Sequence, residues 1–246
     1  MSEMFLLQLA FIMILAFVHV TAGWLLYLSF IPRSAWLSFS GGVSIAYVFL
    51  HIFPELEQAQ QSLEEFNIIY FLEHHAYFVA LIGLSFFYGL ERFLLKRNHS
   101  APTGDKAKPG KGGGKWIFWL HIGSFSLYNA LIGYLMVYRD SSISEEFFYF
   151  LAMAFHFLVN DHSLYHHHNR RYLHYGRWVL SAAIILGWLI GLYVELSEAA
   201  TGMLFAFVAG GIILNVLKEE LPEERNSRIL PFMFGGVSYS ALLFLG

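Results

Sequence analysis

The chain contains no cysteine among its 246 residues. This absence excludes disulfide bonds, metal sites built from thiolates and enzymes that use a cysteine nucleophile. Charge is also scarce, because Asp, Glu, Lys and Arg together make up only 13% of the residues. A soluble domain of average composition has about 25% charged residues, so this chain has too little charge to cover a soluble surface of its size.

Apolar residues take the place of the missing charge and make up 57% of the chain. They gather in runs of about 18–25 residues, which is the length that a helix needs to cross a bilayer. The strands of a membrane β-barrel would instead alternate apolar and polar residues in segments of about ten, and these runs do not alternate. The composition therefore predicts an all-α fold, a polytopic membrane helix bundle that forms a single transmembrane domain over residues 1–246.

About eight membrane spans follow from the positions of the apolar runs. The expected spans are Met4–Ile31, Leu37–Phe53, Asn67–Leu95, Trp116–Tyr138, Phe147–Tyr165, Trp178–Leu196, Thr201–Leu217 and Ile229–Gly246. Between the third and fourth spans, residues 96–115 include the sequence KPGKGGGK. This Gly, Pro and Lys content predicts a disordered basic loop.

The charged residues divide between the two sides of the predicted bundle. Lys and Arg gather in the loops after the third, fifth and seventh spans, whereas the opposite loops carry mainly Asp and Glu. The positive-inside rule then places the basic loops in the cytoplasm and both termini outside the cytoplasm. We therefore expect an integral protein of the cell (inner) membrane, with the lipid bilayer as a partner and no nucleic acid. A homodimer is one assembly that the sequence leaves open.

Two segments of the chain suggest an internal repeat. Residues 41–55 read GGVSIAYVFLHIFPE and residues 210–223 read GGIILNVLKEELPE, so each has a Gly pair, an apolar stretch and a final Pro-Glu. The two spans that contain them are expected to cross the membrane in opposite directions. Transporters use such inverted repeats to build two alternating states around a central site. Chance similarity is the alternative, because Gly pairs and Pro are common in membrane helices.

Polar residues lie within the apolar runs. An ionisable group at bilayer depth costs at least ~2.5 kcal/mol, so each is a candidate functional residue. The fifth span contains His156, Asn160 and Asp161, and the fourth contains Asn129. Imidazole, carboxylate and amide oxygen are ligands for zinc and similar divalent ions. We interpret His156, Asn160 and Asp161 as a polar pathway and a candidate metal site. Asn129 is open to a second interpretation, as a polar link between helices.

Three further sets of polar residues have other interpretations. His51 and Glu55 share a helix face at the outer end of the second span and are candidates for an entrance. His19 is alone in the first span and is interpreted as a packing histidine or a polar link between helices. The segment DHSLYHHH contains four histidines that are candidates for loose metal capture in the cytoplasm, namely His162, His166, His167 and His168. Part of it also matches one histidine box of a membrane di-iron enzyme, but the sequence has no second box with that spacing.

The second and seventh spans resemble those of the ZIP (Zrt-, Irt-like) family of divalent metal transporters. The segment GVSIAYVFLHIFPE is similar to the family's Gly-rich helix ending in His-x-x-Pro-Glu. The segment AGGIILNVLKEELPEE is similar to its closing Gly-rich helix ending in Leu-Pro-Glu. Eight spans, both ends outside, a long cytoplasmic loop after the third span and an inverted repeat of the first three and last three helices also fit this family.

The metal-binding spans depart from the family pattern. The family's fourth span typically reads His-Asn-x-x-Asp-Gly, whereas the segment from Tyr128 to Gly133 keeps only the Asn and the Gly. The fifth span typically reads His-Glu-x-Pro-Glu, whereas here only His156 is kept. The resemblance therefore implies at most one weakly bound divalent ion, held by His156 with Asn129, Asn160 and Asp161.

The resemblance implies a transporter and not an enzyme. Zinc or a similar divalent metal ion would cross by alternating access, through rocking of one helix bundle against another around a site between the fourth and fifth helices. The metal would be cargo, and no prosthetic group is expected. The missing carboxylates leave open a ZIP-fold protein that has lost transport and acts as a scaffold or sensor. A His-rich membrane metalloenzyme is a third hypothesis.

Overall fold

The fold is known from a computed structural model, which describes residues 3–25, 33–65, 75–99, 113–138, 142–220 and 228–245. All regular structure in these ranges is helical, as the composition predicted, and they contain no strand. The elements in chain order are α1 (Glu3–Leu25), α2 (Arg33–Tyr47), η1 (Val48–Ile52), α3 (Phe53–Glu65), α4 (His75–His99), α5 (Gly113–Val137), α6 (Ile143–His168), η2 (Tyr172–Gly176), α7 (Arg177–Tyr193), α8 (Glu198–Asn215), η3 (Val216–Glu220) and α9 (Ile229–Leu245), where η marks a π-helix.

The eight expected spans match eight helical runs in the described residues, because α2, η1 and α3 form one run and η2–α7 and α8–η3 form two others. Five of these runs are long and apolar enough to cross a membrane, and they contain α1, α2–η1–α3, α5, η2–α7 and α8–η3. The apolar stretches of α4 and α9 are shorter. α6 is not among the five, since its polar residues lower its mean hydropathy. Helix also extends into both ends of the loop expected over 96–115, and residues 100–112 lie outside the described part.

Three pairs of helices cross at glycines that touch the partner's backbone. The pairs are α2 with α9, α4 with α8, and α5 with α7, and their glycines are Gly42 with Gly235, Gly83 with Gly210, and Gly133 with Gly187. A Cβ atom added at any of the six would lie 1.9–2.2 Å from a carbonyl oxygen. In all six cases that oxygen belongs to the residue three positions before the partner glycine. Small residues at such crossings let membrane helices approach closely.

The glycine contacts define a register between the two similar segments. Gly42 and Gly210 occupy equivalent positions in their crossings. With these two aligned, η1 and η3 each begin six residues later, at Val48 and Val216. Pro54 and Pro222 then also align, each twelve residues after its glycine. Proline lacks the N–H that an α-helix needs, and a π-helical turn is one way in which a helix adjusts around such a break.

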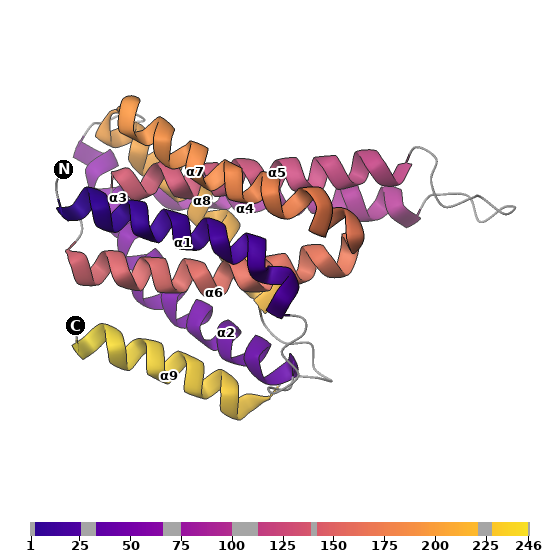
Figure 1. The fold of residues 1–246 in the computed structure, drawn as a ribbon. Helices are drawn as coiled ribbons and strands as arrows, with labels where there is room; N and C mark the ends of the chain where they lie inside the picture. Colours follow the sequence, from indigo (N-terminus) through magenta and orange to yellow (C-terminus); the bar gives the residue numbers. More distant parts are fainter. Residues whose placement is uncertain are drawn as a thin grey trace, which may run out of the picture.

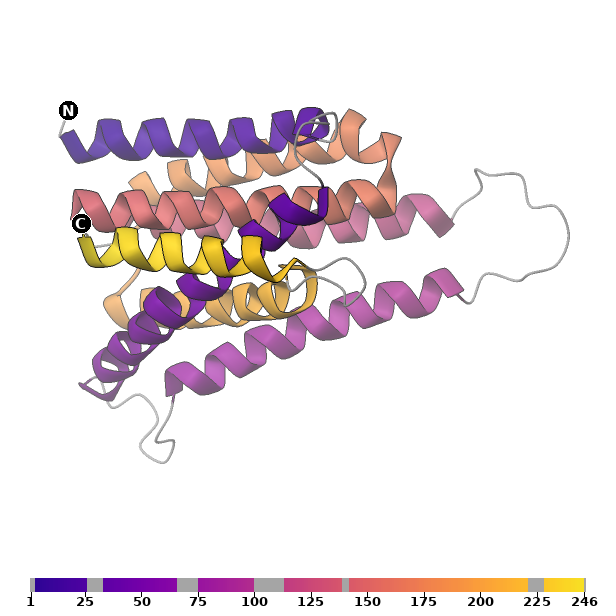
Figure 2. The ribbon, with the colours of Figure 1, turned by 90° about the horizontal axis from the view of Figure 1, so that it is seen from below.

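The helices form two groups. The first bundle contains α1, α5, α6 and α7, in which α1 packs on α6 and α7 and α5 packs on α7. The second bundle contains α2, α3, α4, α8 and α9, in which α2 packs on α9 and both α3 and α4 pack on α8. Figure 1 shows α1, α5, α6 and α7 lying together above α2 and α9. In Figure 2 the run from α2 to α3 lies aslant to α9.

Aromatic side chains fill much of the seam between the two bundles. Phe39 of α2 meets Phe155 of α6 edge to face, with ring centroids 5.4 Å apart. Phe87 of α4 meets Tyr128 of α5 in the same way at 5.6 Å. On α9, the hydroxyl of Tyr239 donates to the carbonyl oxygen of Phe148 at 3.3 Å. The seam therefore consists largely of ring contacts, whereas the three helix pairs within the bundles meet through glycine and backbone.

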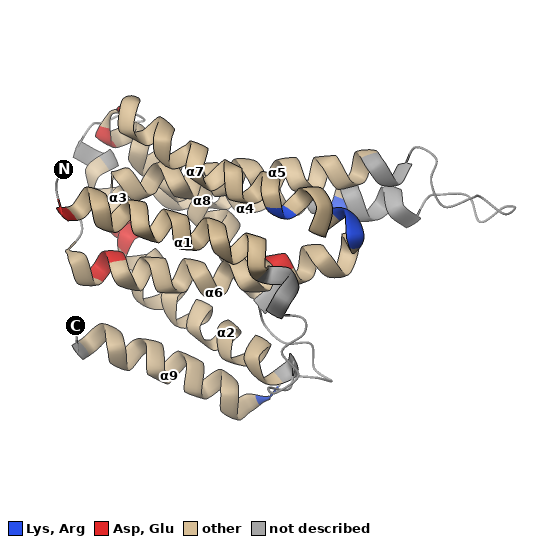
Figure 3. Cartoon of the chain, in the orientation of Figure 1, with Lys and Arg blue, Asp and Glu red and all other residues tan. Residues whose placement is uncertain are grey.

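Charge separates along the long axis of the molecule. α1 begins and α9 ends at the same end of the bundle (Figure 1). Acidic residues gather at this end and basic residues at the opposite one (Figure 3). We call these the acidic end and the basic end. The shared location of the two termini agrees with an even number of crossings.

Candidate functional site

The four residues of the predicted metal site are all buried in the first bundle. Their side chains retain 3% exposure or less, and they are Asn129 on α5 with His156, Asn160 and Asp161 on α6. Buried polar groups of this kind need partners, because an unpaired polar group in an apolar environment costs free energy. Two adjoining networks of hydrogen bonds supply these partners.

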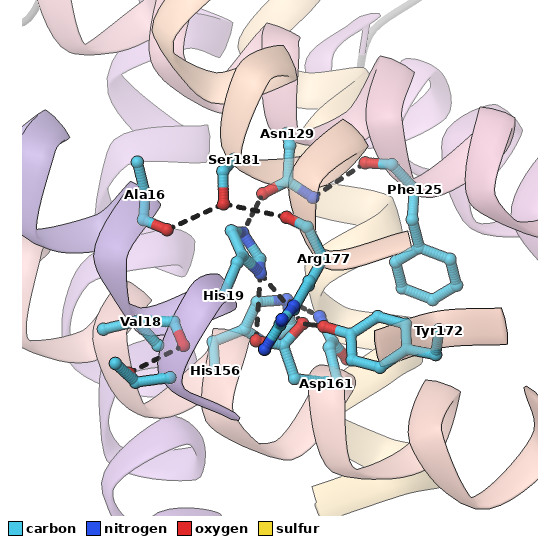
Figure 4. A network of polar contacts seen from close by, with 12 residues as sticks. Ala16, Val18, His19, Phe125, Asn129, His156, Asp161, Tyr172, Arg177 and Ser181 are labelled. Atoms are coloured by element: carbon cyan, nitrogen blue, oxygen red, sulfur yellow. Dashed lines mark hydrogen bonds and ion pairs between the residues drawn. The ribbon is translucent and has the colours of Figure 1, made fainter. Parts of the chain in front are cut away.

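His19 of α1 is the centre of the first network (Figure 4). Its Nδ1 lies 2.8 Å from Oδ1 of Asp161, and its Nε2 lies 2.9 Å from Oδ1 of Asn129. The Asn129 amide is oriented by a 2.7 Å bond from Nδ2 to the carbonyl oxygen of Phe125. Its Oδ1 and the Asp161 carboxylate therefore both accept, and both ring nitrogens of His19 donate. This arrangement pairs the imidazole with a carboxylate and an amide oxygen in the interior.

The same network joins α7 to α1. The hydroxyl of Tyr172, in η2, donates to Asp161. Ser181 of α7 donates to the carbonyl oxygen of Ala16 at 2.8 Å, and Nη1 of Arg177 donates to the carbonyl oxygen of Val20 at 3.1 Å. The network thus links all four helices of the first bundle. None of its hydrogen bonds among the described residues reaches the second bundle, so the network stabilises the first bundle as a unit.

His156 is the centre of the second network. Nδ2 of Asn160, one turn along α6, lies 2.9 Å from Nε2 of His156. The hydroxyl of Tyr128 lies 3.0 Å from the same nitrogen. Because an amide Nδ2 can only donate, Nε2 of His156 is an acceptor and carries the lone pair. Oδ1 of Asn160 is buried and has no hydrogen-bond partner among the residues that the structure describes.

The predicted residues therefore divide between two networks. Asn129 and Asp161 bind His19, whereas His156 and Asn160 bind each other and Tyr128. In the described residues no group of three or more His, Asp or Glu side chains is arranged to hold a metal ion. An unprotonated imidazole nitrogen and an amide oxygen without a partner, side by side, are nevertheless suited to a cation.

A cavity of about 850 Å³ lies at the acidic end, between the two bundles. Four carboxylates line it, those of Glu55, Glu145, Glu195 and Glu198. His51 and Glu55, the predicted entrance residues, are both in its lining, and Nδ1 of His51 lies 3.9 Å from Oε1 of Glu55. The Ser142 capping box, in which Glu145 bonds back to the start of α6, fixes one acidic wall. We call this cavity the acidic vestibule.

One face of α6 leads from the acidic vestibule to His156. Tyr149 lines the vestibule, Met153 is fully buried, and His156 and Asn160 follow on the same face. Seven residues separate Tyr149 from His156, which corresponds to about 10 Å along the helix axis. His156 therefore lies about two helical turns below the vestibule.

The predicted histidines of the basic end have different surroundings. His162 packs edge to face on Trp36 of α2, with ring centroids 5.6 Å apart. His166 and His167 are exposed. His168 instead contacts His121 of α5, with Nε2 of His168 3.0 Å from Nδ1 of His121.

The sequence did not identify three residues of the site in these roles. His19, Tyr128 and Tyr172 supply the partners of Asp161, Asn129 and His156. A buried histidine in an apolar helix was a signal for His19, and of its two interpretations the structure confirms the polar link. Tyrosine hydroxyls in aromatic-rich helices gave no comparable signal.

Comparison of the chain with family models, with curated proteins and with solved structures found no match.

Proposed function

We propose that this protein is a ZIP-like membrane transporter of zinc or a similar divalent metal ion, working by alternating access. The observation that carries the proposal is the acidic vestibule above the face of α6 that holds His156. Four carboxylates concentrate cations at the vestibule, because clefts lined by one sign of charge focus the electrostatic field. Nε2 of His156, once Nδ2 of Asn160 no longer donates to it, and Oδ1 of Asn160, which has no partner among the described residues, would be the first ligands inside the bundle.

The internal symmetry of the contacts supports a transporter. If the first and second halves are inverted repeats, α2 corresponds to α8 and α4 to α9. The crossing of Gly42 with Gly235 then corresponds to that of Gly210 with Gly83, which has the same three-residue geometry. Related halves in opposite orientations provide two alternating states of similar energy.

The division into two bundles supports the rocking movement. The first bundle carries His156, Asn160 and the His19 network, and its own hydrogen bonds hold it together. Most of the acidic vestibule and the aromatic seam lie between the bundles. Movement of the first bundle along this seam would carry the ion from the acidic end toward the basic end. The positive-inside rule places the basic end in the cytoplasm and both termini outside it.

Metal uptake into vesicles that contain the purified protein tests this function. We expect saturable zinc uptake that His156→Ala reduces at least tenfold and that Asn160→Ala reduces less, because the imidazole is the stronger ligand. His174→Ala is the matched control, since His174 is an exposed histidine that belongs to none of the predicted metal-binding sets. Uptake that is the same in the wild type, His156→Ala and Asn160→Ala would overturn the assignment of the site.

A second candidate is a ZIP-fold protein that binds metal but no longer transports it. The His19 network favours this alternative, because Asn129 and Asp161 already have a partner and are not free to bind an ion. Such a scaffold or sensor would bind zinc in detergent with an affinity that depends on His156, yet would show no saturable uptake in the same vesicles.

A further inference from the structure

A pair of histidines joins two helices at the basic end, at a distance from His156 and Asn160. Nδ1 of His121 lies 3.0 Å from Nε2 of His168, and the two rings meet edge to face with centroids 5.2 Å apart. His121 is eight residues from Asn129 on α5, and His168 is twelve residues from His156 on α6. These separations correspond to about 12 Å and about 18 Å of helix.

The surroundings of His168 keep its imidazole neutral. Phe118 packs edge to face on its ring, with centroids 5.2 Å apart. Burial, followed by charge interactions with His167 and Arg171, lowers the pKa of His168 to about 4. The site itself follows from geometry, since a ring nitrogen of His121 and one of His168 face each other across two helices. Arg171 also opposes any incoming cation, so coordination bonds have to supply the affinity.

We infer that His121 and His168 form a binding site for Cu²⁺ or Ni²⁺ that bridges α5 and α6. The usual metal–imidazole distance is about 2.0–2.1 Å. For an ion at this distance from two nitrogens that are 3.0 Å apart, the N–metal–N angle is about 94°. This angle is close to the 90° between neighbouring ligands in the tetragonal geometry that Cu²⁺ and Ni²⁺ prefer. Tetrahedral zinc would require the nitrogens to separate to about 3.3 Å.

The remaining coordination positions are open to water or to a third imidazole. The ring of His167 lies 6.4 Å from that of His121 between centroids, and its side chain is exposed. A bound ion would fix the beginning of α5 against the end of α6, two helices of the first bundle. Without metal, the same two nitrogens share one proton in a simple hydrogen bond. The experiment therefore has to distinguish a metal site from this hydrogen bond.

Copper titration of the untagged full-length protein in detergent tests the site, with electron paramagnetic resonance as the readout. We expect one Cu²⁺ per chain in a tetragonal signal with at least two nitrogen ligands. His121→Asn and His168→Asn should each lower the affinity at least tenfold and remove one nitrogen from the signal. His174→Asn is the matched control, because His174 is an exposed histidine beyond α6 whose Nδ1 bonds to the carbonyl oxygen of Arg170 at 2.9 Å.

Two results would overturn the inference. One is a copper signal and affinity that are unchanged in both His121→Asn and His168→Asn, provided that both variants elute as folded protein. The other is loss of the signal in His166→Asn, which would assign the copper to the exposed end of α6. The inference is independent of the proposed transport, since His156→Ala should lose zinc uptake and keep copper binding.

Discussion

Replacing His19 by leucine should strongly destabilise the first bundle. His19 and Asp161 are 1% and 0% exposed and form an ion pair at 2.8 Å. His19→Leu keeps a side chain of similar size but leaves a buried carboxylate whose remaining donor among the described residues is Tyr172. Breaking one partner of a buried pair typically costs about 3–5 kcal/mol, because an uncompensated charge remains.

The double variant His19→Leu/Asp161→Leu should recover much of this loss. Removal of both partners eliminates the buried charge and leaves only Asn129 and Tyr172 short of one hydrogen bond each. Membrane hydrogen bonds contribute about 0.6 kcal/mol on average and up to about 1.7 kcal/mol, because the unfolded chain also finds partners in the membrane. We therefore expect a total loss of about 1–3 kcal/mol for the double variant, which is about 2 kcal/mol less than the loss for His19→Leu alone.

Unfolding in mixed micelles of increasing SDS content, followed by tryptophan fluorescence, measures these free energies. Ser181→Ala is the control, since it removes a hydrogen bond between α7 and α1 but no charge, and should cost about 1 kcal/mol or less. A single His19→Leu variant within 1 kcal/mol of the wild type would refute the reasoning. A double variant less stable than His19→Leu would also refute it.

Three further predictions follow from other parts of the structure. Gly133→Ala should lower the free energy of unfolding by about 1–3 kcal/mol, because its Cβ would lie 2.2 Å from the carbonyl oxygen of Ile184. Gly123→Ala, on the same helix, is the control in the same unfolding assay. Its Cβ would meet nothing within 4 Å, so this variant should be neutral or slightly stabilising. Glu55→Gln should reduce zinc uptake about two- to threefold at low ionic strength, because it removes one charge from the acidic vestibule. This difference should shrink at about 0.15 M salt, which screens the charges. Glu57→Gln, on the same helix but outside the vestibule, should leave uptake unchanged. The folded-state pKa of His168, about 4, lies below its ordinary value of 6.5, so its contribution to stability should be complete above pH 6.5 and be lost as the pH falls toward 4. Thermal unfolding between pH 4 and 7 should show this loss in the wild type and a flatter profile in His168→Asn.

The sequence predicted the helical fold because apolar runs of this length have few alternatives. A backbone in a bilayer must satisfy its own hydrogen bonds, and a helix does so within one segment. The similarity of residues 41–55 and 210–223 was visible too, but with a one-residue difference in length. Aligning the first glycine of each pair causes that difference, whereas in the helix crossings it is Gly42, the second of its pair, that has the same contacts as Gly210. Local sequence does not say which glycine of a pair touches the neighbouring helix.

The burial of the candidate site's polar residues was predictable from the sequence, but their pairings were not. The cost of polar groups in hydrocarbon singles out His156, Asn160 and Asp161, and all three are buried. Their partners depend on the tertiary structure, since His19 lies 142 residues from Asp161 and 110 from Asn129 along the chain. For the same reason His121, which shares a helix face with Asn129 in the sequence, instead meets His168 at the end of another helix.

The contrast between glycine crossings and the aromatic seam has a consequence for how this chain tolerates mutation. At the crossings a single methyl group already collides with a carbonyl oxygen, so even the smallest enlargement should be selected against. Along the seam, rings that touch edge to face can be exchanged for other large side chains with less disturbance. In a library of single substitutions sorted for membrane expression, we therefore expect the glycine positions within each bundle to tolerate few replacements. The aromatic positions between the two bundles should tolerate many.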